Sequence, residues 1–198
     1  MIKKYKFSDN YCTFKGKRNY LHSTNIFDQI LNIIDKDFSE IEISFKKKIN
    51  FKPIIIISDK ICDFKKNSIF VEFFIKKKSK LTYGYLIKSN RKITQYRKYN
   101  EKKFQKSLIF NKDIILIKKR FRLSFIEKVT SAAMSFLNTK TQKNKKTKWY
   151  LVKINFIFSK NFEQCRDLKL LIKKNSLNFF VFDILQKKKI GSMLFLKK

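Results

Sequence analysis

The spacing of apolar residues predicts a first helix near the start of the chain. Six apolar residues fall on one face at helical spacing: Ile26, Phe27, Ile30, Leu31, Ile33 and Ile34. Ser23, Thr24 or Asn25 can cap the start of this helix, since each side chain accepts a hydrogen bond from a first-turn amide. We therefore expect a helix over residues 26–34 with its apolar face buried.

A second helix is predicted over residues 125–137, where apolar residues recur with the same spacing. It follows Ser124-Phe-Ile-Glu127, the pattern of a capping box, in which hydroxyl and carboxylate each bind a backbone amide of the first turn.

Most of the remaining chain has the pattern of strands. The predicted strands are short, β-branched or aromatic, and bounded by charged residues. They cover residues 40–45, 53–57, 68–76, 80–88, 112–118, 148–158, 168–173, 178–186 and 190–197. Lysine-rich tight turns join the third of these to the fourth and the eighth to the ninth, so each of these two pairs is expected to form a hairpin.

The two halves of the chain share one pattern. A shift of 99 residues places Asn25–Asp28 on Ser124–Glu127 and keeps the apolar faces of both helices in phase. The hairpin 68–88 then corresponds to 177–197. This repeat predicts two α+β units, residues 1–90 and 108–198, joined by a linker over 91–107. Packing two such units together would bury more apolar surface than either could alone.

One apolar helix followed by several long antiparallel strands resembles the hotdog fold, in which a curved sheet wraps a central helix. Two such units in one chain resemble a double hotdog. The resemblance covers nearly the whole chain in element order and contains no diagnostic motif. It implies action on acyl thioesters carried by coenzyme A or acyl carrier protein, as a dehydratase or thioesterase. This implication comes from the fold alone.

The resemblance also implies where a site would lie. The dehydratase branch carries a histidine in a Gly- and Pro-rich segment before the central helix, together with an acid on a helix. Here Tyr20-Leu-His22-Ser-Thr-Asn25 stands in that place, without the glycines and prolines. His22 is then the expected catalytic acid/base, Asp28 or Glu127 the supporting carboxylate, and Tyr20 and Asn25 the residues that position the substrate.

Each of these residues also has a purely structural interpretation. His22, the only histidine of the chain, can be a surface loop residue. A carboxylate in the first helical turn stabilises the helix dipole by about 0.5–1 kcal/mol, which accounts for Asp28 or Glu127 without any catalysis. Imidazole exchanges protons near neutral pH, so the chemistry favours His22 if the site is catalytic.

The composition is extremely basic, but the basic residues are mostly lysine, which weakens the argument for a nucleic-acid ligand. The net charge is +33, and lysine supplies 42 of the 48 basic residues. Nucleic-acid surfaces usually include many arginines, because the guanidinium group pairs with phosphate and guanine. Residues with A/T-rich codons (Lys, Ile, Phe, Asn and Tyr) total 114, against 12 for Gly, Ala, Arg and Pro. An AT-rich genome, as in a symbiont or organelle, would produce this balance without a ligand.

Two alternatives to the thioester hypothesis remain open. The first is a structural RNA-binding protein such as an organellar ribosomal component, since surface lysines attract polyanions at low salt. The second is a non-catalytic scaffold within a larger assembly. A homodimer is compatible with each hypothesis.

The cysteines, the hydropathy and the absence of known motifs predict which metal sites, cofactors and locations the protein has. Cys12, Cys62 and Cys165 are odd in number and widely spaced, which predicts reduced thiols and no zinc site. Cys12 as a nucleophile is the minority interpretation. No phosphate-binding loop or cofactor motif is present, so we expect no cofactor. The chain begins without an apolar signal segment and contains no run long enough to cross a membrane, which predicts a cytoplasmic or organelle-matrix protein.

Overall fold

The computed structural model describes residues 1–16, 18–34, 37–98, 102–117, 123–140, 148–157 and 168–197. These residues form two compact units, Met1–Tyr99 and Asn100–Lys198. The boundary falls inside the predicted linker. No helix within the described ranges is long and apolar enough to span a bilayer.

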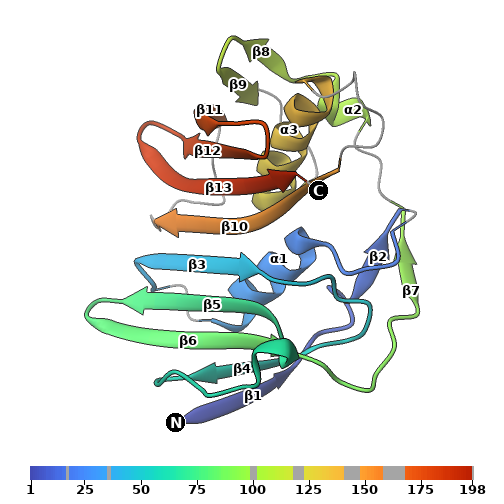
Figure 1. Cartoon of the computed structure of the whole chain (residues 1–198), viewed down its shortest axis with the longest axis vertical. Helices are drawn as coiled ribbons and strands as arrows, with labels where there is room; N and C mark the ends of the chain where they lie inside the picture. Colours follow the sequence, from blue (N-terminus) through green and yellow to red (C-terminus); the bar gives the residue numbers. More distant parts are fainter. Residues whose placement is uncertain are drawn as a thin grey trace. The chain divides into compact units, whose positions relative to one another are not determined.

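The first unit has one long helix and an antiparallel sheet (Figure 1). The strands of this sheet lie in the order β1-β4-β6-β5-β3. Two short strands, β2 and β7, pair in parallel as a separate ladder. The elements are β1 (Ile2–Lys6), β2 (Thr13–Lys15), α1 (Ser23–Ile33), β3 (Glu40–Phe45), β4 (Ile54–Ser58), the 3-10 turn η1 (Lys66–Ser68), β5 (Ile69–Lys77), β6 (Lys80–Ile87) and β7 (Gln95–Arg97).

The second unit repeats this plan. Its antiparallel strands lie in the order β10-β13-β12-β11-β9-β8, and α3 contacts β9 and β11. The elements are α2 (Lys102–Gln105), β8 (Ile109–Asn111), β9 (Ile114–Ile117), α3 (Phe125–Lys140), β10 (Trp149–Ile157), β11 (Leu168–Asn175), β12 (Phe179–Leu185) and β13 (Lys189–Lys197). All nine predicted strands are present, with ends that differ by at most two residues.

The long hairpin has opposite orientations in the sheets of the two units. In the first unit β5, the leading strand of the hairpin, pairs with β3, the strand that follows the helix. In the second unit β13, the trailing strand, pairs with β10, the strand that follows α3. The predicted match between the two hairpins therefore holds for sequence order and not for position in the sheet. Descent of both units from one ancestor stays a prediction.

Alternation along the strands places the core of the first unit between its sheet and α1. Ile41 and Ile43 of β3 are completely buried, whereas Glu42 and Ser44, which alternate with them, are partly exposed. Ile26, Phe27 and Ile30 on α1 are buried as the helical spacing predicted. On the sheet, Gly84 is covered by the ring of Phe73, its partner on the adjacent strand, which leaves no room for a side chain there.

The helix α3 begins with the predicted capping box. The Ser124 amide donates to Glu127 Oε2 at 3.0 Å, and the Glu127 amide donates to Ser124 Oγ at 3.3 Å. The amides of Ser124, just before the helix, and of Glu127, in its first turn, are therefore both satisfied by side chains. The helix continues to Lys140, beyond the predicted residue 137.

Removing the hydroxyl of this capping box should destabilise the second unit. We expect Ser124→Ala to lower the free energy of unfolding by about 1 kcal/mol, because one amide loses its acceptor. Ser135→Ala, in the body of the same helix, should cause no loss, since alanine favours the helix interior. Denaturant unfolding of the full chain measures both. Equal stability of the Ser124→Ala variant and the wild type would contradict this role.

The tight hairpin turns form without glycine. In the turn between β5 and β6, Lys77 pairs with Lys80 and Lys78 has φ +53°. In the turn between β8 and β9, Lys112 has φ +46°. Glycine or asparagine normally occupies such left-handed positions, since other side chains are strained there. The lysine-rich composition thus leaves strain in both turns.

Relief of this strain should be measurable. Lys78→Asn is expected to raise the free energy of unfolding by about 0.5–1 kcal/mol, since asparagine tolerates the left-handed region. Lys76→Asn, at an exposed position of the preceding strand β5, should instead lower it, because asparagine is disfavoured in strands. Thermal or denaturant unfolding distinguishes the two. A stability loss of similar size in both variants would count against strain at Lys78.

Candidate functional site

A group of buried polar side chains lies at the start of α1. The helix begins at Ser23, with His22 as the N-cap residue, and the His22 side chain makes no capping hydrogen bond. The prediction that Ser23, Thr24 or Asn25 caps the helix is therefore wrong, because all three lie inside it. Thr24 and Asn25 are buried instead, although such polar residues usually remain near solvent at a helix start.

The centre of this group is a chain of hydrogen bonds between Lys15, Thr24 and His22. Lys15, on β2, is only 1% exposed, and its Nζ donates to Thr24 Oγ1 at 2.8 Å. Thr24 Oγ1 also lies 2.8 Å from His22 Nδ1. Since the ammonium group can only donate, the hydroxyl proton is available to Nδ1. This arrangement favours the tautomer of His22 whose proton is on Nε2.

The surroundings of His22 keep its imidazole neutral. Burial lowers the pKa of His22 from 6.5 to about 3, and the positive charges of Arg18 and Lys15 act in the same direction. A neutral ring with its proton on Nε2 is a hydrogen-bond donor at that atom. It is a weak proton acceptor at neutral pH, so the geometry suits donation better than the predicted acid/base exchange.

A second pair of polar residues on α1, Asn25 and Gln29, binds the N-terminal segment. Asn25 Nδ2 donates to the carbonyl oxygens of Tyr11 and Thr13, at 2.9 and 3.0 Å. One turn further along, Gln29 Oε1 accepts from the Ser8 amide at 2.9 Å. Both amide hydrogens of Asn25 are thus engaged in the fold. The substrate-binding role expected for Asn25 stays a prediction.

The other predicted site residues are divided between the units. Asp28 is partly exposed and lies in the second turn of α1, so its predicted place in the first turn is wrong. It comes four residues after Thr24 and so shares that side of the helix. Tyr20 is half-buried, with Lys48 Nζ 5.0 Å from its ring centre. Glu127 belongs to the second unit, where it is 3% exposed within the capping box.

Sequence reasoning missed Lys15 and Thr24. Lys15 is one of 42 lysines and stands in a three-residue strand that was not predicted. Thr24 appeared only as a possible cap. In the sequence, three polar residues, Ser23 to Asn25, directly follow the only histidine, which could have indicated Thr24. Nothing in the sequence indicates that Lys15 contacts them.

Cys12 does not supply the nucleophile that was considered for it. Cys12 is buried, and this burial raises its pKa to about 11, so it stays a protonated thiol near neutral pH. Cys62 is partly exposed and free, and Cys165 lies outside the described residues. Within the described ranges no three His, Cys, Asp or Glu side chains lie close enough to hold a metal ion.

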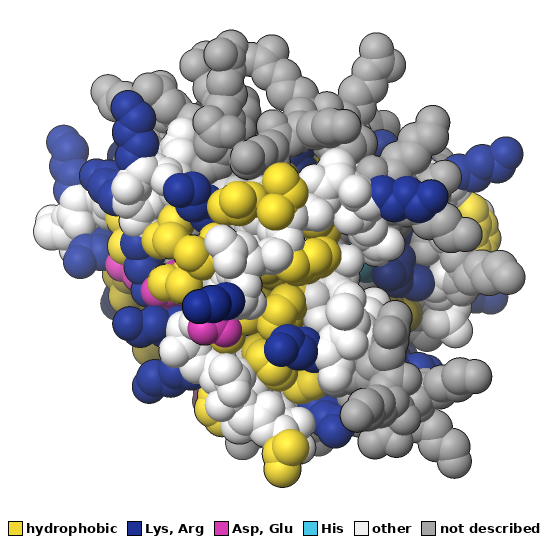
Figure 2. Space-filling view, turned by 90° about the horizontal axis from the view of Figure 1, so that it is seen from above, with side chains coloured by type: hydrophobic (Ala, Val, Ile, Leu, Met, Phe, Trp, Pro, Cys, Tyr) yellow, Lys and Arg dark blue, Asp and Glu magenta, His cyan; other side chains and the backbone are white. Residues whose placement is uncertain are grey.

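The basic side chains do not gather into one patch on the face shown in Figure 2. Lys and Arg side chains are scattered there among apolar and uncharged groups. A dense basic surface would be the expected footprint of a nucleic-acid ligand.

Comparison with known proteins identifies the fold. No family model matches the chain, and no curated protein matches its sequence. Solved structures do match it in three dimensions. One is an acyl-ACP thioesterase from Bacteroides thetaiotaomicron, with a TM-score of 0.50 and 8% identity, covering 100% of this chain and 98% of that one. Another, described as a fusion DH domain, has a TM-score of 0.52 and 9% identity over 100% and 87% of the two chains.

At such low identity these matches establish the fold and no activity. They confirm the α+β architecture expected from element order, with one long helix and an antiparallel sheet in each unit. The chain therefore has the double-hotdog fold.

Proposed function

We propose that this chain binds acyl thioesters of coenzyme A or acyl carrier protein, and that it hydrolyses them. The observation that carries the proposal is the buried hydrogen-bond chain from Lys15 through Thr24 to His22, at the start of the central helix of a hotdog unit. Buried polar groups of this kind are costly to maintain, which is typical of functional sites.

His22 is the proposed donor to the thioester carbonyl oxygen. A neutral imidazole that holds its proton on Nε2 can donate it to the oxygen on which negative charge develops. The start of α1 carries the positive end of the helix dipole, which stabilises the same charge. Lys15 and Thr24 act through His22, because they fix its tautomer, and are therefore positioning residues.

Asp28 is the proposed base for the attacking water. Its carboxylate lies on the Thr24 side of α1 and can accept a proton from water as the oxygen adds to the carbonyl carbon. The carbon–sulfur bond then breaks, and the departing thiolate takes up the proton that Asp28 accepted. Dehydration, in contrast, requires a histidine that gains and loses a proton near neutral pH. The low pKa of His22 therefore favours hydrolysis.

Turnover assays with matched variants test this proposal. The full chain is incubated with acyl-CoA and acyl-carrier substrates of increasing chain length, and thiol release is measured; hydration of 2-enoyl-CoA is followed in parallel. We expect thiol release, a loss of about 100-fold in kcat for His22→Ala, and a smaller loss for Lys15→Met. Lys4→Met, which removes an exposed lysine of β1, is the control and should retain wild-type turnover.

Three results would contradict the proposal. They are undiminished turnover of His22→Ala, hydration activity without hydrolysis, and the absence of both binding and turnover with every substrate. If the last result came with rRNA binding that weakens steeply with salt, the RNA-binding alternative would be favoured.

The neutral state of His22 predicts how stability depends on pH. The unfolded chain binds a proton at His22 below pH 6.5, whereas the folded chain does so only near pH 3. Stability from the neutral ring is therefore complete above pH 6.5 and decreases as pH falls. Between pH 6.5 and 5.5, wild type should lose about 1 kcal/mol more than His22→Gln. Denaturant unfolding at both values tests this, and parallel losses in the two proteins would contradict it.

A further inference from the structure

One connection of the first unit is a crossover, whereas the matching connection of the second unit is a short turn. β4 and β5 both pair antiparallel with β6, on its two sides, so they run parallel to each other. The chain must therefore cross β6 between Ser58 and Ile69. In the second unit β11 and β12 are neighbours, joined by the short turn 176–178. This difference arises because the long hairpin has opposite orientations in the two sheets.

The crossover is fixed to the sheet face that points away from α1. The Cys62 amide donates to the Tyr85 hydroxyl at 3.2 Å, and the rings of Phe64 and Tyr85 meet edge to face at 5.2 Å. The Tyr85 side chain is on the opposite face from Gly84 and Leu86, its neighbours on β6. Burial raises the pKa of Tyr85, so its hydroxyl keeps its proton. The crossover thus forms one wall over an outer sheet surface.

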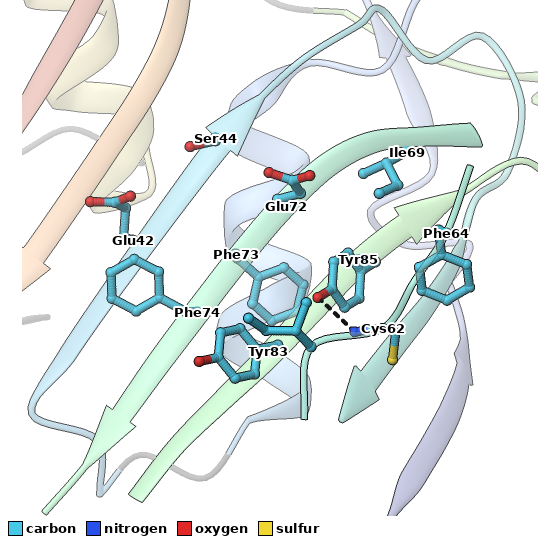
Figure 3. Close-up of a pocket in the computed structure, with 11 residues that line it drawn as sticks. Glu42, Ser44, Cys62, Phe64, Ile69, Glu72, Phe73, Phe74, Tyr83 and Tyr85 are labelled. Atoms are coloured by element: carbon cyan, nitrogen blue, oxygen red, sulfur yellow. Dashed lines mark hydrogen bonds between the residues drawn. The ribbon is translucent and has the colours of Figure 1, made fainter. Parts of the chain in front are cut away.

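Between this wall and strands β3, β5 and β6 lies a cavity of about 400 Å³ (Figure 3). This volume is within the range of small-molecule sites. Two outward-facing rows of paired residues supply most of its base: Ser44, Glu72 and Tyr85 in one row, and Glu42, Phe74 and Tyr83 in the next.

The charge of this cavity is opposite to that of the chain. Among the residues that the structure describes, its lining contains Glu42 and Glu72 and no lysine or arginine, although the chain has 48 basic residues. Lys46 Nζ reaches Glu72 Oε2 at 3.1 Å from outside the lining, and both side chains are nearly half exposed. An exposed ion pair of this kind is weak and can be exchanged for another cation.

We propose that this cavity binds a small organic ammonium ion with an aromatic or aliphatic body. The carboxylates of Glu42 and Glu72 attract the ammonium group. The rings of Phe74 and Tyr83 offer cation–π and apolar contact, and Ile61 and Phe64 cover the ligand body from the crossover. An anion would be repelled here and attracted almost everywhere else on the chain. The site lies apart from the start of α1 and does not depend on the thioester proposal.

Calorimetric titration of the full chain at physiological salt tests this site with 2-phenylethylammonium. 2-Phenylethanol and phenylacetate serve as neutral and anionic probes of similar shape. We expect saturable binding of the ammonium probe to one site, at least about tenfold tighter than the alcohol. The basic surface of the chain repels cations in general, so saturable uptake of a cation is specific evidence for an acidic pocket.

Substitutions inside and outside the lining test whether the probe binds in the cavity. The double change Glu42→Gln and Glu72→Gln should weaken binding about tenfold or more. Ile61→Lys should weaken it similarly, and this variant keeps the fold because that side chain is 74% exposed. Asp63→Asn removes an exposed carboxylate from the crossover outside the lining and should change affinity less than twofold.

Any of four results would overturn the inference. The ammonium probe could show no saturable binding, or bind no tighter than the alcohol. Wild-type affinity in the Ile61→Lys variant, or a loss in Asp63→Asn equal to that of the double glutamine variant, would do the same.

Discussion

A lysine ammonium group that is almost wholly removed from water determines the arrangement at the start of α1. An unpaired buried charge would cost several kcal/mol, so Lys15 requires an acceptor, and Thr24 provides one. The Thr24 hydroxyl then has its own proton left to share, and His22 Nδ1 lies within reach of it. Burial and two nearby positive charges keep the imidazole neutral. The tautomer of His22, and with it the chemistry proposed for the first unit, depends on this one buried cation.

The same helix is attached to the rest of its unit by different residues on each side. Ile26, Phe27 and Ile30 are buried in the core, while Asn25 and Gln29 bind the backbone of the N-terminal segment. This segment leads into β2, which carries Lys15. Apolar packing and these polar contacts thus hold the lysine and the histidine in place, although the His22 side chain makes no capping hydrogen bond.

Sequence periodicity predicted most of the fold, because long helices and strands leave regular apolar patterns. Both side-chain hydrogen bonds of the α3 capping box were predicted from Ser124 and Glu127. Short elements such as β1, β2 and β8 were missed, since three to five residues carry too little pattern. The opposite order of the two hairpins was also missed, because element order along the chain is the same in both units. His22 was recognised as the only histidine, whereas Lys15 could not be distinguished among 42 lysines. The outer cavity depends on the crossover and left no sequence signal.

The central claim is that His22 donates a hydrogen bond from a neutral ring to a thioester carbonyl. Nitrogen-15 NMR of the single imidazole tests it directly, with a non-hydrolysable acyl-CoA analogue that keeps a carbonyl group as the ligand. The account predicts a neutral ring protonated at Nε2 throughout, whose Nε2 resonance shifts as the analogue saturates the protein. A ring that titrates near pH 6.5, or a resonance unchanged at saturation, would contradict it.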